Sequence, residues 1–162
     1  MKIFRVPAGG LNFWWPHVER RMEEALEEHG RHWGYTVKDL KRLLKKDLIA
    51  LHLAFEDGGM SPLFIGLTET VLLPQKLTYR VMFLTGEKME LWLEEGMEYI
   101  LANARACGAQ DIEINGRKGW ERVLAPSGFS VDFICLRKEL WPAAAERNRP
   151  QITHPGKSKF LS

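Results

Sequence analysis

The sequence is poor in cysteine and in long apolar runs, and each shortage excludes a class of protein. The two cysteines, Cys107 and Cys135, cannot make a disulfide framework or a cysteine-only metal site. Both stand among apolar residues, which predicts two buried, reduced thiols in a protein made in the cytoplasm. No apolar run approaches the roughly 18–20 residues that cross a bilayer, so no membrane partner is expected. Residues 1–16 lack the apolar stretch of a secretion signal.

The chain also lacks a charge excess of either sign. It has 23 Lys and Arg against 21 Asp and Glu, a net charge of +2, which makes nucleic acid an improbable partner. Its 162 residues, 45% of them hydrophobic, suit one domain with a real core. His17, His29 and His32 have no cysteine or carboxylate at a diagnostic spacing, so we predict no metal site.

Hydrophobic periodicity predicts one mixed order of strands and helices. Asn12–Trp15 is expected to be a loop, with Pro16 as the first helical residue. Thr36 and Asp39 have the spacing of a capping box before the second helix. The expected strands are 2–7, 48–55, 63–73, 77–84, 111–114 and 129–136, and the expected helices are 17–29, 37–46, 88–106 and 118–124.

The composition changes after residue 141. Residues 142–162 contain three prolines and four basic residues against one acidic residue, which gives this stretch a net charge of 4 − 1 = +3. Such a stretch cannot bury enough apolar surface to order itself alone. We therefore divide the chain into a domain, 1–141, and an extended basic tail, 142–162.

The end of the domain carries the most specific pattern. Ala106–Gly108 is followed by the strand Asp111–Ile114, the short helix Trp120–Leu124 and then Ser127-Gly128-Phe129. This order resembles the close of the GNAT (Gcn5-related N-acetyltransferase) family, and the resemblance extends over Lys2–Leu140. It implies an α/β (α+β) fold with a mixed central sheet flanked by helices, and acetyl-CoA wedged between two splayed strands. The stretch from Gly116 to Trp120 resembles phage-encoded GNAT-like proteins.

The loop that opens the long helix departs from that family. GNAT enzymes bind pyrophosphate with an Arg/Gln-x-x-Gly-x-Gly/Ala loop, whose free N–H groups face the phosphates at the helix N-terminus. Here Thr85, Gly86 and Glu87 occupy the matching place, with a single glycine. Glu87 and Glu90 bring negative charge, and only Lys88 opposes them. The resemblance therefore implies a degenerate acetyl-CoA loop, and we expect no cofactor.

The proton-transfer groups of the family are missing as well. Its general acid is a tyrosine, and that place is Leu124 in this sequence. His52, Glu69 and Glu113 could in principle act as a base, but none has an activating partner at a recognisable spacing. His52 is expected to be a satisfied core histidine, and the two glutamates to face water.

Two groups of residues are candidates for contact with a protein partner. Aromatic side chains concentrate in interface cores, and an extended tail gains order by lying across another chain. The predicted partner-binding residues are Phe13, Trp14 and Trp15 near the N-terminus, and Arg147, Arg149, Ile152, Lys157, Lys159, Phe160 and Leu161 in the tail.

The sequence leaves two functions open. The first is a non-catalytic GNAT-like domain that serves in assembly, made in the cytoplasm and built into a phage virion through its tail. The second is a divergent N-acetyltransferase that binds acetyl-CoA through Thr85, Gly86 and Glu87. A fold alone does not choose between them.

Overall fold

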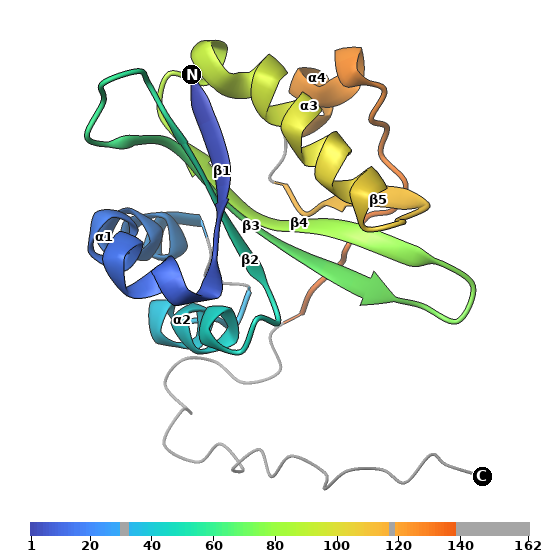
Figure 1. The fold of residues 1–162 in the computed structure, drawn as a ribbon. Coiled ribbons are helices and arrows are strands. Elements are labelled where there is room, and N and C mark those ends of the chain that lie inside the picture. Colours follow the sequence, from blue (N-terminus) through green and yellow to red (C-terminus); the bar gives the residue numbers. More distant parts are fainter. Residues whose placement is uncertain (30–32, 117–118, 139–162) are drawn as a thin grey trace, which may run out of the picture.

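The computed structural model describes residues 1–29, 33–116 and 119–138 (Figure 1). Its centre is a five-stranded sheet in the order β1-β2-β3-β4-β5. The pairs β1–β2, β2–β3 and β3–β4 are antiparallel, and β5 runs parallel to β4. The mixed α+β sheet expected from the resemblance is confirmed. The strands are β1 (Lys2–Val6), β2 (Ala50–Phe55), β3 (Pro62–Leu72), β4 (Leu77–Gly86) and β5 (Asp111–Ile114).

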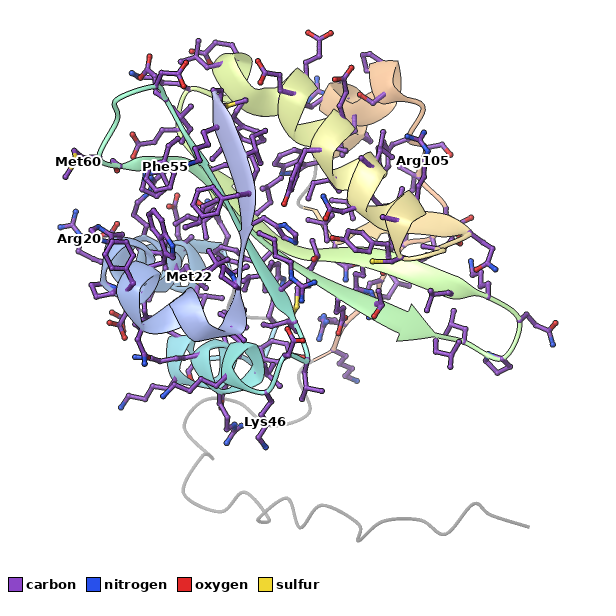
Figure 2. The ribbon with its side chains drawn as sticks, viewed as in Figure 1. Arg20, Met22, Lys46, Phe55, Met60 and Arg105 are labelled. Atoms are coloured by element: carbon purple, nitrogen blue, oxygen red, sulfur yellow. The ribbon has the colours of Figure 1, made fainter. Side chains whose placement is uncertain are left out.

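Helices cover both faces of this sheet (Figure 1). On one face, Met22 of α1 belongs to the same core cluster as Leu51 and Leu53 of β2, all without solvent exposure. Figure 2 shows Met22 between α1 and the sheet, whereas Arg20, two residues earlier, points to solvent. The other face packs against α3, with α4 beside it. The helices are α1 (Leu11–His29), α2 (Val37–Lys45), α3 (Met89–Ala106) and α4 (Trp120–Leu124), with 3-10 turns η1 (Ala8–Gly10) and η2 (Ala125–Ser127).

The start of α1 corrects the expected loop at Asn12–Trp15. The helix begins at Leu11, directly after η1, and Pro16 lies inside it. A proline there removes one helical hydrogen bond. Beginning at Leu11 nevertheless adds two buried side chains, Leu11 and Trp15, to the helix's core-facing stripe. That burial outweighs the lost bond, and the full stripe is Leu11, Trp15, Val18, Met22 and Leu26.

The predicted capping box of α2 is confirmed, and both of its hydrogen bonds are present. The Asp39 N–H donates to the Thr36 hydroxyl oxygen at 3.2 Å, and the Thr36 N–H donates to the Asp39 carboxylate at 3.0 Å. These bonds satisfy two N–H groups that a helix start would otherwise leave without partners. The Thr36 hydroxyl, by hydrogen bonding, is the main cause that lowers the pKa of Asp39.

The predicted strand at 129–136 is wrong. These residues form no strand, and Val131, Phe133, Ile134 and Leu136 are 63–90% exposed. The strand pattern is present, but a strand needs a partner, and β5 is only four residues long. The prediction of two buried thiols is wrong as well, because Cys107 and Cys135 are exposed. Cys107 follows the last turn of α3, and Cys135 lies in the unpaired stretch.

Several predictions fall outside the described residues. They concern His32, the start of the short helix at 118, and the whole tail with its contact residues Arg147, Arg149, Ile152, Lys157, Lys159, Phe160 and Leu161. Within the described part, no helix is both long and apolar enough to span a membrane. The same residues contain no group of three His, Cys, Asp or Glu that could hold a metal ion.

Candidate functional site

The candidate site is the place where β4 continues past the end of β5. The parallel pairing runs from Thr78 opposite Asp111 to Val81 opposite Ile114, and ends as the Asn115 N–H donates to the Val81 carbonyl at 3.2 Å. Beyond that point β4 runs to Gly86 paired with β3 alone. We call residues 85–90, between the end of β4 and the first turn of α3, the mouth.

Gly86 in the mouth is required by packing. A Cβ at this position would lie 2.7 Å from the Leu63 carbonyl oxygen and 3.0 Å from both Phe64 Cβ and Trp92 Cζ2. Real Cβ atoms do not approach other heavy atoms so closely. Position 86, which the resemblance placed at the phosphates, therefore requires glycine because β3, β4 and α3 pack closely around it.

The backbone of Glu87 is engaged inside the protein. Its N–H donates to the Leu63 carbonyl at 2.9 Å, which extends the β3–β4 ladder by one more bond. Its carbonyl oxygen accepts a hydrogen bond from Trp92 Nε1, also at 2.9 Å. Trp92 is buried under the mouth, so this bond fixes the start of α3 against the sheet.

The side chain of Glu87 has a partner that the sequence did not reveal. It is 74% exposed, and one carboxylate oxygen lies 3.5 Å from the guanidinium of Arg21 in α1. Arg21 is mostly buried and also donates to the Pro62 carbonyl oxygen. The expectation that only Lys88 opposes the acids of the mouth is therefore incomplete. No local spacing could signal Arg21, because the contact joins two distant parts of the chain.

The turn into α3 is made by Lys88. Its φ of 50° and ψ of 54° place it in the left-handed region, and its side chain makes no capping bond to the helix. The first turn that follows contains an exposed acid, Glu90. A carboxylate at a helix N-terminus complements the helix dipole, so Glu90 supplies the negative charge that this end of α3 attracts.

The space behind the mouth is apolar and nearly full. A cavity of about 10 Å³ lies between the ends of β3 and β4 and the inner face of α3. That volume is about the least that admits one water molecule. Trp92 and Phe64 line it, with ring centroids 5.0 Å apart. Other lining residues are Gly66, Val81, Leu84, Gly96, Met97, Ile100 and Ile114.

A buried polar cluster crosses the middle of the same sheet face. His52 of β2 places Nε2 2.8 Å from the Thr68 hydroxyl and Nδ1 3.1 Å from the Tyr99 hydroxyl of α3. The Thr68 hydroxyl is also 3.0 Å from the Tyr79 hydroxyl. Burial lowers the pKa of His52 to about 4 and raises the pKa of Tyr79 and of Tyr99. All four groups are neutral at pH 7, which fits the expected core histidine.

Glu69 and Glu113 do not simply face water as expected. Their side chains are 28% and 25% exposed, and both bind Arg80 of β4, at 2.9 Å and 3.1 Å. The three residues lie directly opposite one another across β3, β4 and β5. The Glu113 carboxylate, through its hydrogen bonds, is the main cause that raises the pKa of Arg80. Both glutamates are thus held as ion-pair partners.

The aromatic residues near the N-terminus divide between surface and core. Phe13 is 68% exposed, whereas Trp15 is 2% exposed and belongs to the core, with the Lys41 ammonium 5.0 Å from its ring centroid. Trp14 lies between them, half-buried against Phe4 and Phe55. The predicted partner contact on this side therefore depends on Phe13 and the open edge of Trp14.

Leu124, at the position of the family's tyrosine, is buried in α4. A leucine side chain can neither donate nor accept a proton. The described residues around the mouth therefore place no general acid where the resemblance would require one.

Comparison with known proteins adds structural neighbours only. No family model matches the sequence, and no curated protein does. A probable acetyltransferase of known structure superposes with a TM-score of 0.67 at 15% identity, over 88% of this chain and 99% of that one. A predicted acetyltransferase from Clostridium acetobutylicum, solved with acetyl-CoA, has a TM-score of 0.61 at 14% identity, over 86% of this chain and 96% of that one.

Two further neighbours have named acceptors. An aminoglycoside acetyltransferase from an uncultured soil sample, solved with sisomicin, has a TM-score of 0.61 at 14% identity, over 86% of this chain and 96% of that one. Glucosamine-6-phosphate N-acetyltransferase from Arabidopsis thaliana has a TM-score of 0.59 at 11% identity, over 86% and 97%. At such low identities the likeness concerns the fold, and this chain has a GNAT-like fold.

Proposed function

We propose that this protein is a GNAT-fold domain that has lost acetyl transfer and serves as a protein–protein assembly component. The observation that carries the proposal is the engaged backbone at the mouth. The Glu87 N–H and carbonyl, which border the place of the coenzyme's diphosphate, are bonded to Leu63 and to Trp92. A phosphate oxygen would have to break the bond to Leu63 to gain the Glu87 N–H as a donor.

Charge and space at the mouth support the same conclusion. Glu87 and Glu90 bring two carboxylates to the start of α3, and a phosphate about 5 Å from a carboxylate is repelled by on the order of 1–3 kcal/mol near a surface. Arg21 neutralises part of this charge, but its guanidinium also donates a hydrogen bond to the Pro62 carbonyl oxygen. The cavity of about 10 Å³ beneath Trp92 is far smaller than a pantetheine arm. The residues present do not fit acetyl-CoA.

The exposed apolar residues support an assembly role. Phe13 and the stretch from Val131 to Leu136 expose large apolar side chains at two separate places. Exposed apolar patches in soluble proteins commonly mark contact sites. The resemblance of Gly116–Trp120 to phage-encoded proteins makes a phage virion the assembly that we propose, with the basic tail as the docking segment.

The experiment for the coenzyme is a titration of the full chain with acetyl-CoA by calorimetry, repeated as a thermal-shift assay. We expect no saturable heat and no rise in melting temperature up to millimolar ligand. A Kd in the micromolar range would overturn the proposal. At a hundredfold excess over such a Kd, bound ligand stabilises the fold by about 2.7 kcal/mol, so both assays would register it.

The experiment for assembly is deletion of residues 142–162. We expect the shortened chain to keep its fold, measured by circular dichroism and melting temperature, and to lose incorporation into the particle. Unchanged incorporation would remove the tail from the proposal. Phe13→Ser in the full chain is a second test variant, which probes the other proposed surface without altering the tail.

A divergent N-acetyltransferase is the second candidate. It is favoured by the separation of β4 from β5 beyond Val81 and Ile114, and by the acetyltransferase names of the structural neighbours. It would use Thr85, Gly86 and Glu87 at the coenzyme. The same titration decides between the two, because saturable micromolar binding is required by this candidate and excluded by the first.

A further inference from the structure

The outer face of α2 is basic along its whole length. Lys38, Arg42 and Lys46 are exposed and stand four residues apart, so they form one row along the helix, with Lys45 beside it. Figure 2 shows Lys46 pointing away from the rest of the protein. Residues 37–46 contain five bases and one acid, which gives this segment a net charge of 5 − 1 = +4.

The acids closest to this row in the sequence already have partners. Asp39 caps α2 and pairs with Arg42 at 3.0 Å, and Asp47 pairs with Arg5 at 2.9 Å. The other three bases of the face form no ion pair with any described residue, and they are Lys38, Lys45 and Lys46. The positive charge of this face is therefore not neutralised within the part of the chain that the structure describes.

The outer face of α3 carries the opposite charge with the same spacing. Glu90, Glu94 and Glu98 are exposed and again stand four residues apart, with Glu95 beside them. Residues 89–98 contain four acids and no base, a net charge of 0 − 4 = −4. None of the four carboxylates pairs with a base among the described residues. Each row spans eight residue steps, which is about 12 Å along its helix.

Leu91 gives the acidic face an apolar centre. It is 47% exposed, and Glu94, Glu95 and Glu98 follow it at the spacings that share one helix face. A lysine side chain covers apolar surface with its methylene groups and keeps its ammonium group in water. A lysine-rich helix face laid over α3 would therefore cover Leu91 and place ammonium groups beside the carboxylates.

The two faces cannot meet within one chain, because α2 and α3 lie on opposite sides of the sheet (Figure 1). A second copy supplies the matching face, with a row of equal length and a charge of equal size and opposite sign. A polyanion such as nucleic acid fits less well, because the acidic face of α3 repels it and the whole chain is only +2.

We propose that copies of this chain associate head to tail, with the basic face of α2 in one copy packed on the acidic face of α3 in the next. The occupant of each face is a second copy because the two rows complement each other in charge and length. Such a contact is heterologous, so it leaves one free α2 and one free α3 and builds an open chain or a closed ring.

The first test measures how association of the full chain depends on salt. Sedimentation and light scattering give the mean mass up to about 0.1 mM protein. We expect a mass above that of one chain in about 0.01 M salt and a monomer in about 1 M salt. The reason is that screening shortens the range of charge interactions from about 30 Å to about 3 Å between these two conditions.

The second test reverses each face separately. The α2 variant is Lys38→Glu/Lys45→Glu, and the α3 variant is Glu94→Lys/Glu98→Lys. Each places like charges across the contact and should weaken association about tenfold or more at low salt. The matched control, Lys2→Glu/Arg20→Glu, makes the same change in net charge as the α2 variant at exposed residues of β1 and α1, and should associate like the native chain.

A mixture of the two variants makes the test specific to a head-to-tail contact. The α3 variant keeps a native α2, and the α2 variant keeps a native α3, so an equimolar mixture should associate although each variant alone does not. A variant that had failed to fold would not recover in the mixture, and circular dichroism checks the fold of each one directly.

Three results would overturn the proposal. One is a native chain that is monomeric at about 0.1 mM in low salt, where a contact with a Kd near 10 µM is mostly formed. Another is an association that neither variant weakens or that the mixture does not restore. The third is a monomer that binds a labelled oligonucleotide of about 20 nucleotides and loses this binding in the α2 variant, which would assign the basic face to a polyanion.

This inference goes beyond the proposed function and does not depend on it. Glu94 and Glu98 lie outside the mouth, and neither variant alters residues 85–90. A failure to associate would therefore leave the acetyl-CoA titration unaffected, and binding of acetyl-CoA would leave the salt-dependent mass to be explained by the two helix faces.

Discussion

The Nδ1 atom of His52 lies 3.1 Å from the Tyr99 hydroxyl, and this contact ties β2 to α3 across the middle of the sheet. The other ring nitrogen, Nε2, lies 2.8 Å from the Thr68 hydroxyl of the neighbouring strand. A neutral imidazole has one donor and one acceptor, and each has a hydroxyl group as its partner. Nδ1 therefore keeps its partner only while Tyr99 has its hydroxyl group, whereas Nε2 also lies 3.4 Å from the Tyr79 hydroxyl.

Tyr99→Phe should destabilise the protein by about 1–2 kcal/mol, because it leaves one nitrogen of the buried imidazole without a partner. Urea unfolding at pH 7 measures the change. Tyr35→Phe is the matched control at a tyrosine that is 41% exposed, where we expect a change within about 0.5 kcal/mol. Equal effects at the two positions would mean that the His52 contact contributes nothing.

The protein should lose stability as the pH falls from about 6.5 to about 4. The folded pKa of His52 is about 4, against an ordinary value of 6.5, so in this window the unfolded chain binds a proton that the folded chain does not. The stability is fully present above pH 6.5 and decreases by up to about 3 kcal/mol through the window. The lowered pKa values of Asp39 and Asp111 add to the loss below about pH 5, where the carboxyls of the unfolded chain begin to bind protons.

Urea unfolding measured at half-unit steps of pH tests this expectation. In His52→Asn the slope between pH 6.5 and about pH 5 should become nearly flat, even where the variant is less stable at every pH. A slope that is the same in both proteins would show that another group takes up the proton.

Gly86→Ala should destabilise the protein by about 1–3 kcal/mol, because the added methyl group lies 2.7 Å from the Leu63 carbonyl oxygen. The matched control is Gly9→Ala, where no heavy atom lies within 4 Å and φ is not positive. Melting temperature is the readout for both. If the melting temperature of Gly86→Ala is close to that of the control, packing does not require glycine at position 86.

The sequence predicted most of the fold because its signals are local. The capping box at Thr36, the period-two strands and the stripe of α3 each depend on residues within a turn or two of each other. The start of α1 was missed because Pro16 suggested a beginning, whereas the burial of Leu11 and Trp15 depends on a sheet that no local pattern describes.

The candidate site was harder to predict because its contacts join distant residues. The ion pair between Arg21 and Glu87, and the bonds from His52 to Thr68 and Tyr99, cannot be recognised from any spacing. The strand expected at 129–136 has the right residues, but strand formation depends on a partner edge. The described chain provides only four residues of β5 for that purpose.

Arg80 should stabilise the end of the sheet by neutralising two carboxylates at once. Its guanidinium contacts Glu69 on β3 and Glu113 on β5, and all three side chains are about a quarter exposed. Arg80→Gln leaves two glutamates without their common partner and should cost about 1 kcal/mol at low salt, since partly exposed ion pairs contribute modestly.

The triple variant Glu69→Gln/Arg80→Gln/Glu113→Gln removes all three charges and should recover most of that loss. Urea unfolding at low salt and in about 1 M salt measures both variants, because screening reduces the difference between them. If Arg80→Gln and the triple variant are equally stable at low salt, neutralisation of the two carboxylates by Arg80 does not stabilise the fold. Arg80 would then contribute mainly through the packing of its alkyl chain, and its replacement by Met should be neutral.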